Sequence, residues 1–309
     1  MNLKSFVPVL LIALVAGGHR LFLALCRPSP PPVRQPERYN CHEPMWSLQT
    51  GNVSSMDLEI CVESVESAIA AERGGACRVE LCSSLAEGGV TPGAGLIAMV
   101  RRHIQIGIFA MIRPRGGDFC YTRHEFETMQ EEIRHARALG ADGVVLGVLD
   151  ERACVDVSRT RQLVELAAPL PVTFHRAIDM TPDLSEALET VLATGAACIL
   201  SSGGAPDAAQ GATQIARMVT QAAGRIAIMP GGGITARNIA ALAQATRATA
   251  FHASARTAVS SPVRFRKPGM AMGATRGREY DRFIVREETV RGLATALQRC
   301  ARPDNPHPS

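Results

Sequence analysis

The chain has 309 residues, 46% of them hydrophobic, so it can bury one large core or two ordinary ones. Its net charge is +4, and residues 1–55, with five basic and two acidic side chains, carry +3 of that charge. The remaining body is close to neutral and aromatic residues are only 4% of the chain, which argues against a nucleic-acid-binding protein.

The nine cysteines are scattered through the sequence, and none of them forms a Cys-x-x-Cys pair. Disulfide frameworks belong mainly to small secreted domains, so reduced thiols are the better interpretation for a chain of this length. We therefore expect a reducing compartment. The cytoplasm is the favoured location, with the nucleus or mitochondria as alternatives.

The first 55 residues differ from the rest. An apolar run between positions 6 and 16 follows Lys4 and resembles the core of a secretory signal, but Gly17 and Gly18 interrupt it before it reaches the about 20 residues that a membrane span needs. Residues 27–32 form a Pro-rich linker. This N-terminal extension is therefore expected to stay outside the folded domain.

Three interpretations of the extension compete. It is a signal or membrane anchor, a transit peptide poor in acidic residues, or an artefact of the gene model with Met56 as the true start. The thiol-rich body favours the last two, so secretion directed by residues 1–25 is the less favoured alternative.

From Met56 onward, short apolar runs rich in β-branched residues alternate with stretches of helical spacing, for example at positions 126–139 and 184–192. Glycines such as Gly140 and Gly195 stand where helices should end, a few residues before the next strand. The predicted strands are Leu58–Val62, Arg78–Cys82, Gly107–Ile112, Gly143–Leu149, Val172–His175, Cys198–Ser201, Ile226–Met229 and Ala250–Ala253.

Eight strand–helix units in residues 56–300 predict an α/β protein with a (β/α)₈ TIM barrel, followed by a disordered tail at 301–309. An open, doubly wound sheet is the main alternative. It has five to seven strands more often than eight, and no G-x-G-x-x-G follows the first strand here.

In such barrels the site lies at the carboxyl ends of the strands. If Leu58 faces the helices, strand alternation turns Glu59, Cys61 and Glu63 toward the barrel axis. The same argument turns Glu80 and Cys82 inward on the second strand. Two neighbouring strands therefore each offer a carboxylate followed by a thiol nearer the mouth.

The two thiols can be interpreted in two ways. Taken singly, Cys61 and Cys82 are small core residues, because free cysteine is among the most buried residue types. As a pair on neighbouring strands they suit a soft metal such as Cu(I), whereas zinc usually takes four ligands and a second pair is not evident.

The inward carboxylates need partners, and Arg113 and Arg115, in the loop after the third strand, are the expected ones. His175, Glu59 and Glu80 are acid–base candidates, and the alternative is a purely structural ion-pair network. The candidates for binding an anion are Arg113, Arg115, Asp118, Arg176, Asp179, the glycine turn Gly231, Gly232 and Gly233 after the seventh strand, and Ser254 and Arg256 after the eighth.

A long stretch from Thr257 to Val285 follows the eighth strand and carries several arginines. Its length predicts an irregular lid over the barrel mouth or an oligomer contact, and the alternative is a solvated basic loop.

The motifs that carry this argument resemble the CutC copper-homeostasis family, over residues from about 56 to 300. They are Glu59-Ile-Cys61, Arg78-Val-Glu-Leu-Cys82, Glu87-Gly-Gly-Val-Thr-Pro92, Met111-Ile-Arg-Pro-Arg-Gly-Gly-Asp-Phe-Cys-Tyr121, Val172-Thr-Phe-His-Arg-Ala177, Met229-Pro-Gly-Gly-Gly-Ile234 and Phe251-His-Ala-Ser-Ala-Arg256.

The resemblance implies a (β/α)₈ barrel that self-associates, as a dimer or tetramer, and a link to copper. It also implies that Cys61 and Cys82 correspond to cysteines implicated in Cu(I) binding in eukaryotic members.

Two hypotheses follow. The first is an intracellular Cu(I)-binding protein of copper homeostasis that uses Cys61 and Cys82, with copper as cofactor or cargo. The second is a barrel enzyme, an isomerase, lyase or hydrolase, acting on a small anionic substrate, either phosphorylated or carboxylated, at the mouth. The mouth is lined with more charged groups than a two-thiol metal carrier needs. The first is preferred, and no catalytic activity is assigned.

Overall fold

A computed structural model describes residues 56–270, 272 and 279–301. The predictions made for the extension 1–55 and for the tail after residue 301 fall outside these residues.

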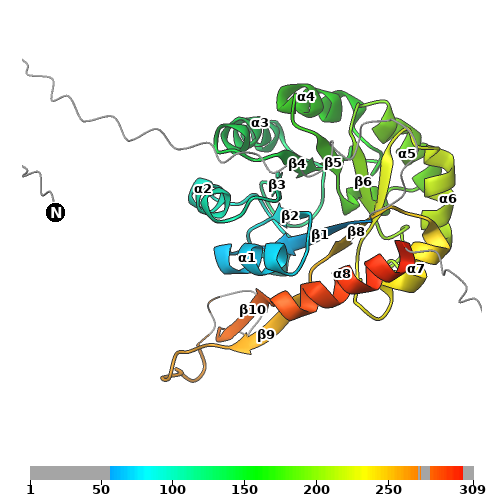
Figure 1. Ribbon diagram of the computed structural model, residues 1–309. Helices are drawn as coiled ribbons and strands as arrows, with labels where there is room; N and C mark the ends of the chain where they lie inside the picture. Colours follow the sequence, from blue (N-terminus) through cyan, green and yellow to red (C-terminus); the bar gives the residue numbers. More distant parts are fainter. Residues whose placement is uncertain (1–55, 271, 273–278, 302–309) are drawn as a thin grey trace, which may run out of the picture. The chain divides into compact units, whose positions relative to one another are not determined.

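Eight parallel strands form one sheet in the order β7-β6-β5-β4-β3-β2-β1-β8 (Figure 1). A parallel bridge between Gly231 and His252 joins the two outer strands and closes the sheet into a barrel. The (β/α)₈ prediction is confirmed. The strands are β1 Asp57–Val62, β2 Arg78–Leu81, β3 Gly107–Met111, β4 Gly143–Leu146, β5 Val172–Phe174, β6 Cys198–Ser201, β7 Ala227–Pro230 and β8 Ala250–Ala253.

Helices follow the strands and form the outer layer (Figure 1). Local sequence fixes their ends: Thr122 and Glu125 form a reciprocal capping box at the start of α3, and Gly140 adopts the left-handed conformation (φ +87°) just after its end. None of the described helices is long and apolar enough to cross a membrane. They are α1 Val65–Arg73, α2 Ala94–His103, α3 Arg123–Ala138, α4 Val157–Ala167, α5 Leu184–Leu192, α6 Ala212–Ala222, α7 Ile239–Thr246 and α8 Glu287–Ala301, with the 3₁₀ turns η1 Leu85–Glu87 and η2 Arg176–Met180.

The core has two parts, because strand side chains alternate in direction. Ile60, Leu81 and Ile108 belong to the main apolar cluster between the strands and the helices. The opposite face of the same strands supplies smaller clusters inside the barrel. One contains Cys61, Cys82, Phe109, Met111 and Val145, and the other contains Cys198, Leu200, Met229 and Ala250. The parity predicted for β1 and β2 is therefore correct.

The stretch after β8 is not an irregular lid. Its two ends pair as an antiparallel hairpin of β9 (Arg256–Ser260) and β10 (Asp281–Val285), beside α1 and α8 (Figure 1). The Val285 amide donates to the Ser67 hydroxyl of α1 at 3.2 Å, which ties the hairpin to the rim. None of the described residues between Thr257 and Val285 lines the cavity at the mouth, although Arg256, directly before the stretch, does. The prediction of a lid is therefore wrong. The pairing of β9 with β10 places these strands beside α1 and α8 instead of over the cavity.

Candidate functional site

A cavity of about 270 Å³ opens at the carboxyl ends of the strands. Its size lies just below the usual range for small-molecule sites. Residues from β1, β2, β3, β6, β8 and β9 and from the loops after β2, β3, β5 and β8 converge on it. They are Cys61, Glu80, Leu85, Gly88, Met111, Arg113, Phe119, His175, Arg176, Leu200, His252, Ser254 and Arg256.

The two cysteines meet beside this cavity, with their sulfur atoms 3.8 Å apart. Cys61 stands near the end of β1 and Cys82 directly follows β2, and both are buried. The Cys82 thiol also approaches Glu80 Oε2 at 3.5 Å. One ligand atom from each of Cys61, Cys82 and Glu80 lies within 4.8 Å of the others, so the three residues could hold a metal ion together.

Both thiols are protonated at neutral pH in this arrangement. The hydrogen bond that Cys61 donates to Cys82, together with burial, raises the pKa of Cys61 well above its ordinary value. The same bond lowers the pKa of Cys82, but burial and the Glu80 carboxylate outweigh it and raise that pKa to about 12. A metal ion must therefore displace these protons before it binds.

Below the thiols lies a buried ionic network built from β1, β2 and β8. Glu59, level with both partners in the sheet register, accepts from Arg78 Nε and pairs with His252 Nδ1 at 2.7 Å. His252 Nε2 in turn lies 3.8 Å from Glu80 Oε2. Glu59, Glu80 and His252 form a second group of potential metal ligands.

Burial alone would raise the pKa of Glu59, but Arg78 and His252 lower it to about 2. Burial alone would lower the pKa of His252, but the Glu80 and Glu59 carboxylates, with the Cys61 thiol, raise it well above its ordinary value. Burial raises the pKa of Glu80. Glu59 is thus a sealed, ionised carboxylate that does not line the cavity, which makes it a poor acid–base candidate.

The expectation that Arg113 and Arg115 would neutralise the inward carboxylates is wrong. Arg78 and His252 do so, and sequence reasoning missed both as site residues. Arg78 shares the parity of Glu80 on β2, so the pattern that turned Glu80 inward also pointed to Arg78.

Arg113 is buried and holds the loops around the mouth together. Its terminal nitrogens donate to the carbonyl oxygens of Glu87, Gly89 and Gly117 at 2.8–2.9 Å. Its Nε has no hydrogen-bond partner among the described residues. The guanidinium also lies over the Phe119 ring, 4.9 Å from the centroid. The side chain is therefore fixed at the cavity wall with one donor left over.

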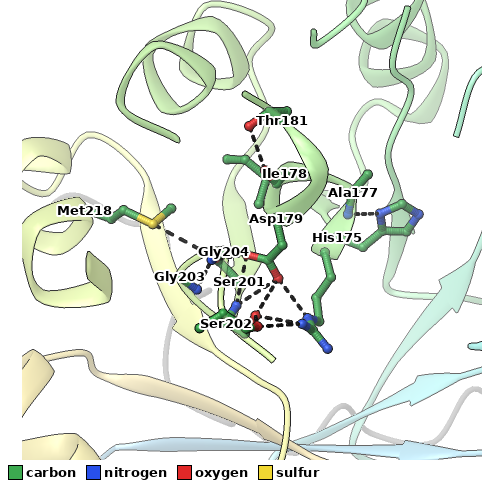
Figure 2. Close-up of polar contacts among 12 residues, drawn as sticks. His175, Ala177, Ile178, Asp179, Thr181, Ser201, Ser202, Gly203, Gly204 and Met218 are labelled. Carbon is green, nitrogen blue, oxygen red and sulfur yellow. Dashed lines mark hydrogen bonds and ion pairs between the residues drawn. The ribbon is translucent and has the colours of Figure 1, made fainter. Parts of the chain in front are cut away.

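His175 lies directly after β5 and is buried. Figure 2 shows its ring beside Ala177. Its Nδ1 accepts a hydrogen bond from the Ala177 amide at 3.2 Å, which assigns the proton to Nε2. That Nε2 has no partner among the described residues. Burial, and secondarily Arg113, lower the pKa of His175 to about 3, so the imidazole is neutral at physiological pH and offers an N–H donor.

Asp179 organises the neighbouring loop rather than the cavity. Figure 2 shows its carboxylate facing the turn after β6, where it accepts from the Ser201 hydroxyl, the Ser202 amide and hydroxyl, and the Gly204 amide at 2.6–3.1 Å. Arg176 Nε also donates to it, at 2.8 Å. Arg176 lines the cavity, whereas Asp179 does not.

The remaining candidates separate into two groups. Ser254 and Arg256 line the cavity. Arg115 and Asp118 pair with each other at 3.0 Å, Arg115 also pairs with Glu125 at 2.6 Å, and neither Arg115 nor Asp118 is a lining residue.

The turn Gly231, Gly232 and Gly233 also lies outside the lining residues. It does not run straight into a helix, since α7 begins only at Ile239. The Gly232 carbonyl accepts from Ala208 and the Gly233 carbonyl from Asn238, which binds this turn to its neighbours. The turn therefore lacks the helix N-terminus that the predicted phosphate cup required.

The fold and site define a (β/α)₈ barrel whose mouth holds a buried thiol pair, an ionic network and a cavity lined by both charged and apolar side chains. The family model described as the CutC family matches residues 56–257, and the chain belongs to this family.

Two similar relatives and one solved structure support the assignment. The chain is 50% identical over 242 residues to a family protein CutC from Chromobacterium violaceum, a match covering 78% of this chain and 98% of that one. It is 48% identical over 248 residues to the copper homeostasis protein cutC homolog of Homo sapiens, covering 80% and 91%. The crystal structure of the putative copper homeostasis protein CutC from Streptococcus agalactiae aligns with a TM-score of 0.62 at 33% identity, covering 64% of this chain and 98% of that one.

Proposed function

We propose that this chain is an intracellular copper-homeostasis protein that binds one Cu(I) ion through Cys61 and Cys82. The observation that carries the proposal is the 3.8 Å separation of two buried sulfur atoms at a cavity wall. Two metal–thiolate bonds of about 2.3 Å let sulfurs that share one ion lie at most about 4.6 Å apart, so this separation suits shared ligation with little movement.

The chemistry of the donors favours Cu(I) over zinc. Thiolate sulfur is a soft ligand that selects Cu(I), whereas structural zinc sites usually collect four ligands. The local group here has two thiols and the Glu80 carboxylate. Two thiolates and one Cu(I) carry a net charge of −1. The cationic His252, next to Cys61 and Glu80, is close enough to offset this negative charge. The names of the relatives from human and mouse, both copper homeostasis protein cutC homolog, point the same way.

A competition titration tests the proposal. Cu(I) is added anaerobically to the reduced full-length protein in the presence of a colorimetric Cu(I) chelator, and to the variants Cys61→Ser and Cys82→Ser. Cys198→Ser is the matched control, because Cys198 is also buried inside the barrel but belongs to the other interior cluster. Circular dichroism checks that each variant is folded.

We expect about one copper per chain for the wild type and the control. Either site variant should bind at least tenfold more weakly, which is about 1.4 kcal/mol. Equal and weak binding by all four proteins would show that the two cysteines are core residues only.

Location and assembly complete the proposal. Thiols that must stay reduced suit the cytoplasm.

The expected self-association is assigned to the β9–β10 hairpin and its connection, where a second copy would cover the exposed side chains of Val263, Phe265, Met270 and Met272. Light scattering of the wild type and of Phe265→Ser tests this: a dimer or tetramer that the substitution weakens is expected, and a monomeric wild type would refute it.

The enzyme hypothesis has less support. Glu59, one of its candidate bases, is sealed in an ion pair away from the cavity, and the similar relatives carry copper-homeostasis or family names rather than an activity.

A further inference from the structure

Part of the cavity is not used by the copper proposal. Three residues that line it, Glu80, Arg113 and His175, are each more than nine-tenths buried. Each carries one buried polar atom without a hydrogen-bond partner among the described residues: Glu80 Oε1, Arg113 Nε and His175 Nε2. Buried polar atoms are nearly always paired, so three orphans around one cavity indicate a missing partner.

The hydrogen-bonding roles of these atoms are fixed by their other contacts. The terminal nitrogens of Arg113 are committed to three loop carbonyls, so its Nε–H keeps a set direction. His175 Nδ1 accepts from the Ala177 amide, so its Nε2 is also a donor. The Phe119 ring lies 4.9 Å from the Arg113 guanidinium and 4.9 Å from the His175 ring centroid, so both groups contact the same aromatic side chain of the lining.

The lining also has a charge preference. It contains the guanidinium groups of Arg113, Arg176 and Arg256 and the imidazole of His252. Asp179 pairs with Arg176 and Glu59 pairs with His252 from outside the lining, which leaves Arg113 and Arg256 against the single lining carboxylate, Glu80. Fixed N–H donors with surplus positive charge suit an oxyanion, and guanidinium groups match the geometry of carboxylate and phosphate oxygens. The Ser254 hydroxyl adds a polar group beside Arg256. Glu80 Oε1 needs a donor instead, which a hydroxyl group supplies.

We propose that this cavity binds a small hydroxylated oxyanion, with its carboxylate or phosphate group held by Arg113, His175 and Arg256 and a hydroxyl group facing Glu80. The volume of about 270 Å³ limits the ligand to a small molecule. The anion donors Arg113, His175 and Arg256 are not among the potential copper ligands. Glu80 is common to both sites, with Oε2 beside Cys82 and Oε1 left for the anionic ligand.

Calorimetry on the reduced, metal-free, full-length protein at low ionic strength tests the proposal. The probes are inorganic phosphate, ribose 5-phosphate, gluconate and neutral ribose. We expect submillimolar binding of at least one hydroxylated anion and no binding of ribose. Comparison of ribose 5-phosphate with gluconate shows whether the anionic group of the ligand is a phosphate or a carboxylate. Inorganic phosphate shows how much of the affinity comes from the anionic group without a hydroxylated carbon chain.

Variants locate the binding. His175→Asn keeps an oxygen that accepts from the Ala177 amide but removes the Nε2 donor, and Arg256→Gln removes a rim charge. Each should weaken the binding probe at least tenfold. Arg152→Gln changes the net charge equally at an exposed residue that does not line this cavity, and it should bind as wild type.

Cys61→Ser should keep the anion affinity even where it loses Cu(I), so failure of the copper proposal is distinguishable from failure of this one. Absence of binding by every charged probe at millimolar concentration would overturn the oxyanion site. Wild-type affinity in both His175→Asn and Arg256→Gln would overturn it as well.

Discussion

The neutral His175 makes a quantitative prediction about acid stability. An unfolded chain protonates histidine with a pKa of about 6.5. In the folded protein, burial and Arg113 lower the pKa of His175 to about 3. Between these two values the unfolded state binds a proton that the folded state does not. The contribution of the neutral His175 to the free energy of unfolding is therefore fully present above about pH 6.5 and is lost as the pH falls toward 3.

The size of the effect follows from the same two values. Between about pH 7 and pH 4.5, linkage predicts a loss of about 2–3 kcal/mol of unfolding free energy from this residue alone. His175→Asn removes the titrating group but keeps an acceptor for the Ala177 amide. Its unfolding free energy should therefore fall less than that of the wild type over this range, by that amount.

Urea unfolding followed by far-ultraviolet circular dichroism at several pH values measures the difference. Other groups that titrate over the same range are common to both proteins and largely cancel in the comparison. A constant offset between the two stability curves, with equal slopes against pH, would refute the argument that His175 is held neutral by burial.

Three further predictions follow from the site. Arg78→Met leaves the Glu59 carboxylate buried with His252 as its remaining ionic partner. It should therefore lower the unfolding free energy, measured by urea titration at neutral pH, by about 3–5 kcal/mol. A loss below about 1 kcal/mol would contradict the pairing. Gly147→Ala would place a methyl group 2.5 Å from the His175 ring, so it should cost about 1–3 kcal/mol and shift the imidazole NMR signals, whereas unchanged signals would show that the ring is not wedged there. Both cysteine thiols are protonated in the metal-free protein, so binding of Cu(I) releases up to two protons. Cu(I) affinity should therefore rise by up to about 100-fold per pH unit, which chelator competition at two pH values measures. An affinity that does not change with pH would exclude release of these protons.

The barrel was predictable because each strand is a short apolar run and because eight units fit the length of the domain. Strand alternation also placed Cys61 and Cys82 on the inner face correctly, since the side-chain period of two depends only on the local sequence.

Partners across strands were not predictable in the same way. Glu59 stands opposite Arg78 on β2 and opposite His252 on β8. This alignment depends on the register between strands and on the closure of the barrel, and the sequence of a single strand specifies neither. The candidate Arg113 was correctly placed at the mouth, but its neighbours are backbone carbonyls, which a sequence does not distinguish.

The hairpin after β8 was missed for a related reason. Its strands, β9 and β10, are separated by a connection of about twenty residues, too long for a tight-turn signal to reveal the pairing. An apparent loop in the sequence therefore became a hairpin beside the mouth, with Arg256 as the residue that reaches the cavity.

The contact between Glu59 and His252 joins positions 193 residues apart, on the first and last strands of the barrel. During synthesis the ribosome releases Glu59 and Arg78 long before His252 exists. A nascent chain that ends at β7 lacks one of the partners of its buried carboxylate and the strand that closes its sheet. Completion of the barrel, and with it protection from proteolysis, must therefore wait until β8 has left the exit tunnel, late in the synthesis of the chain.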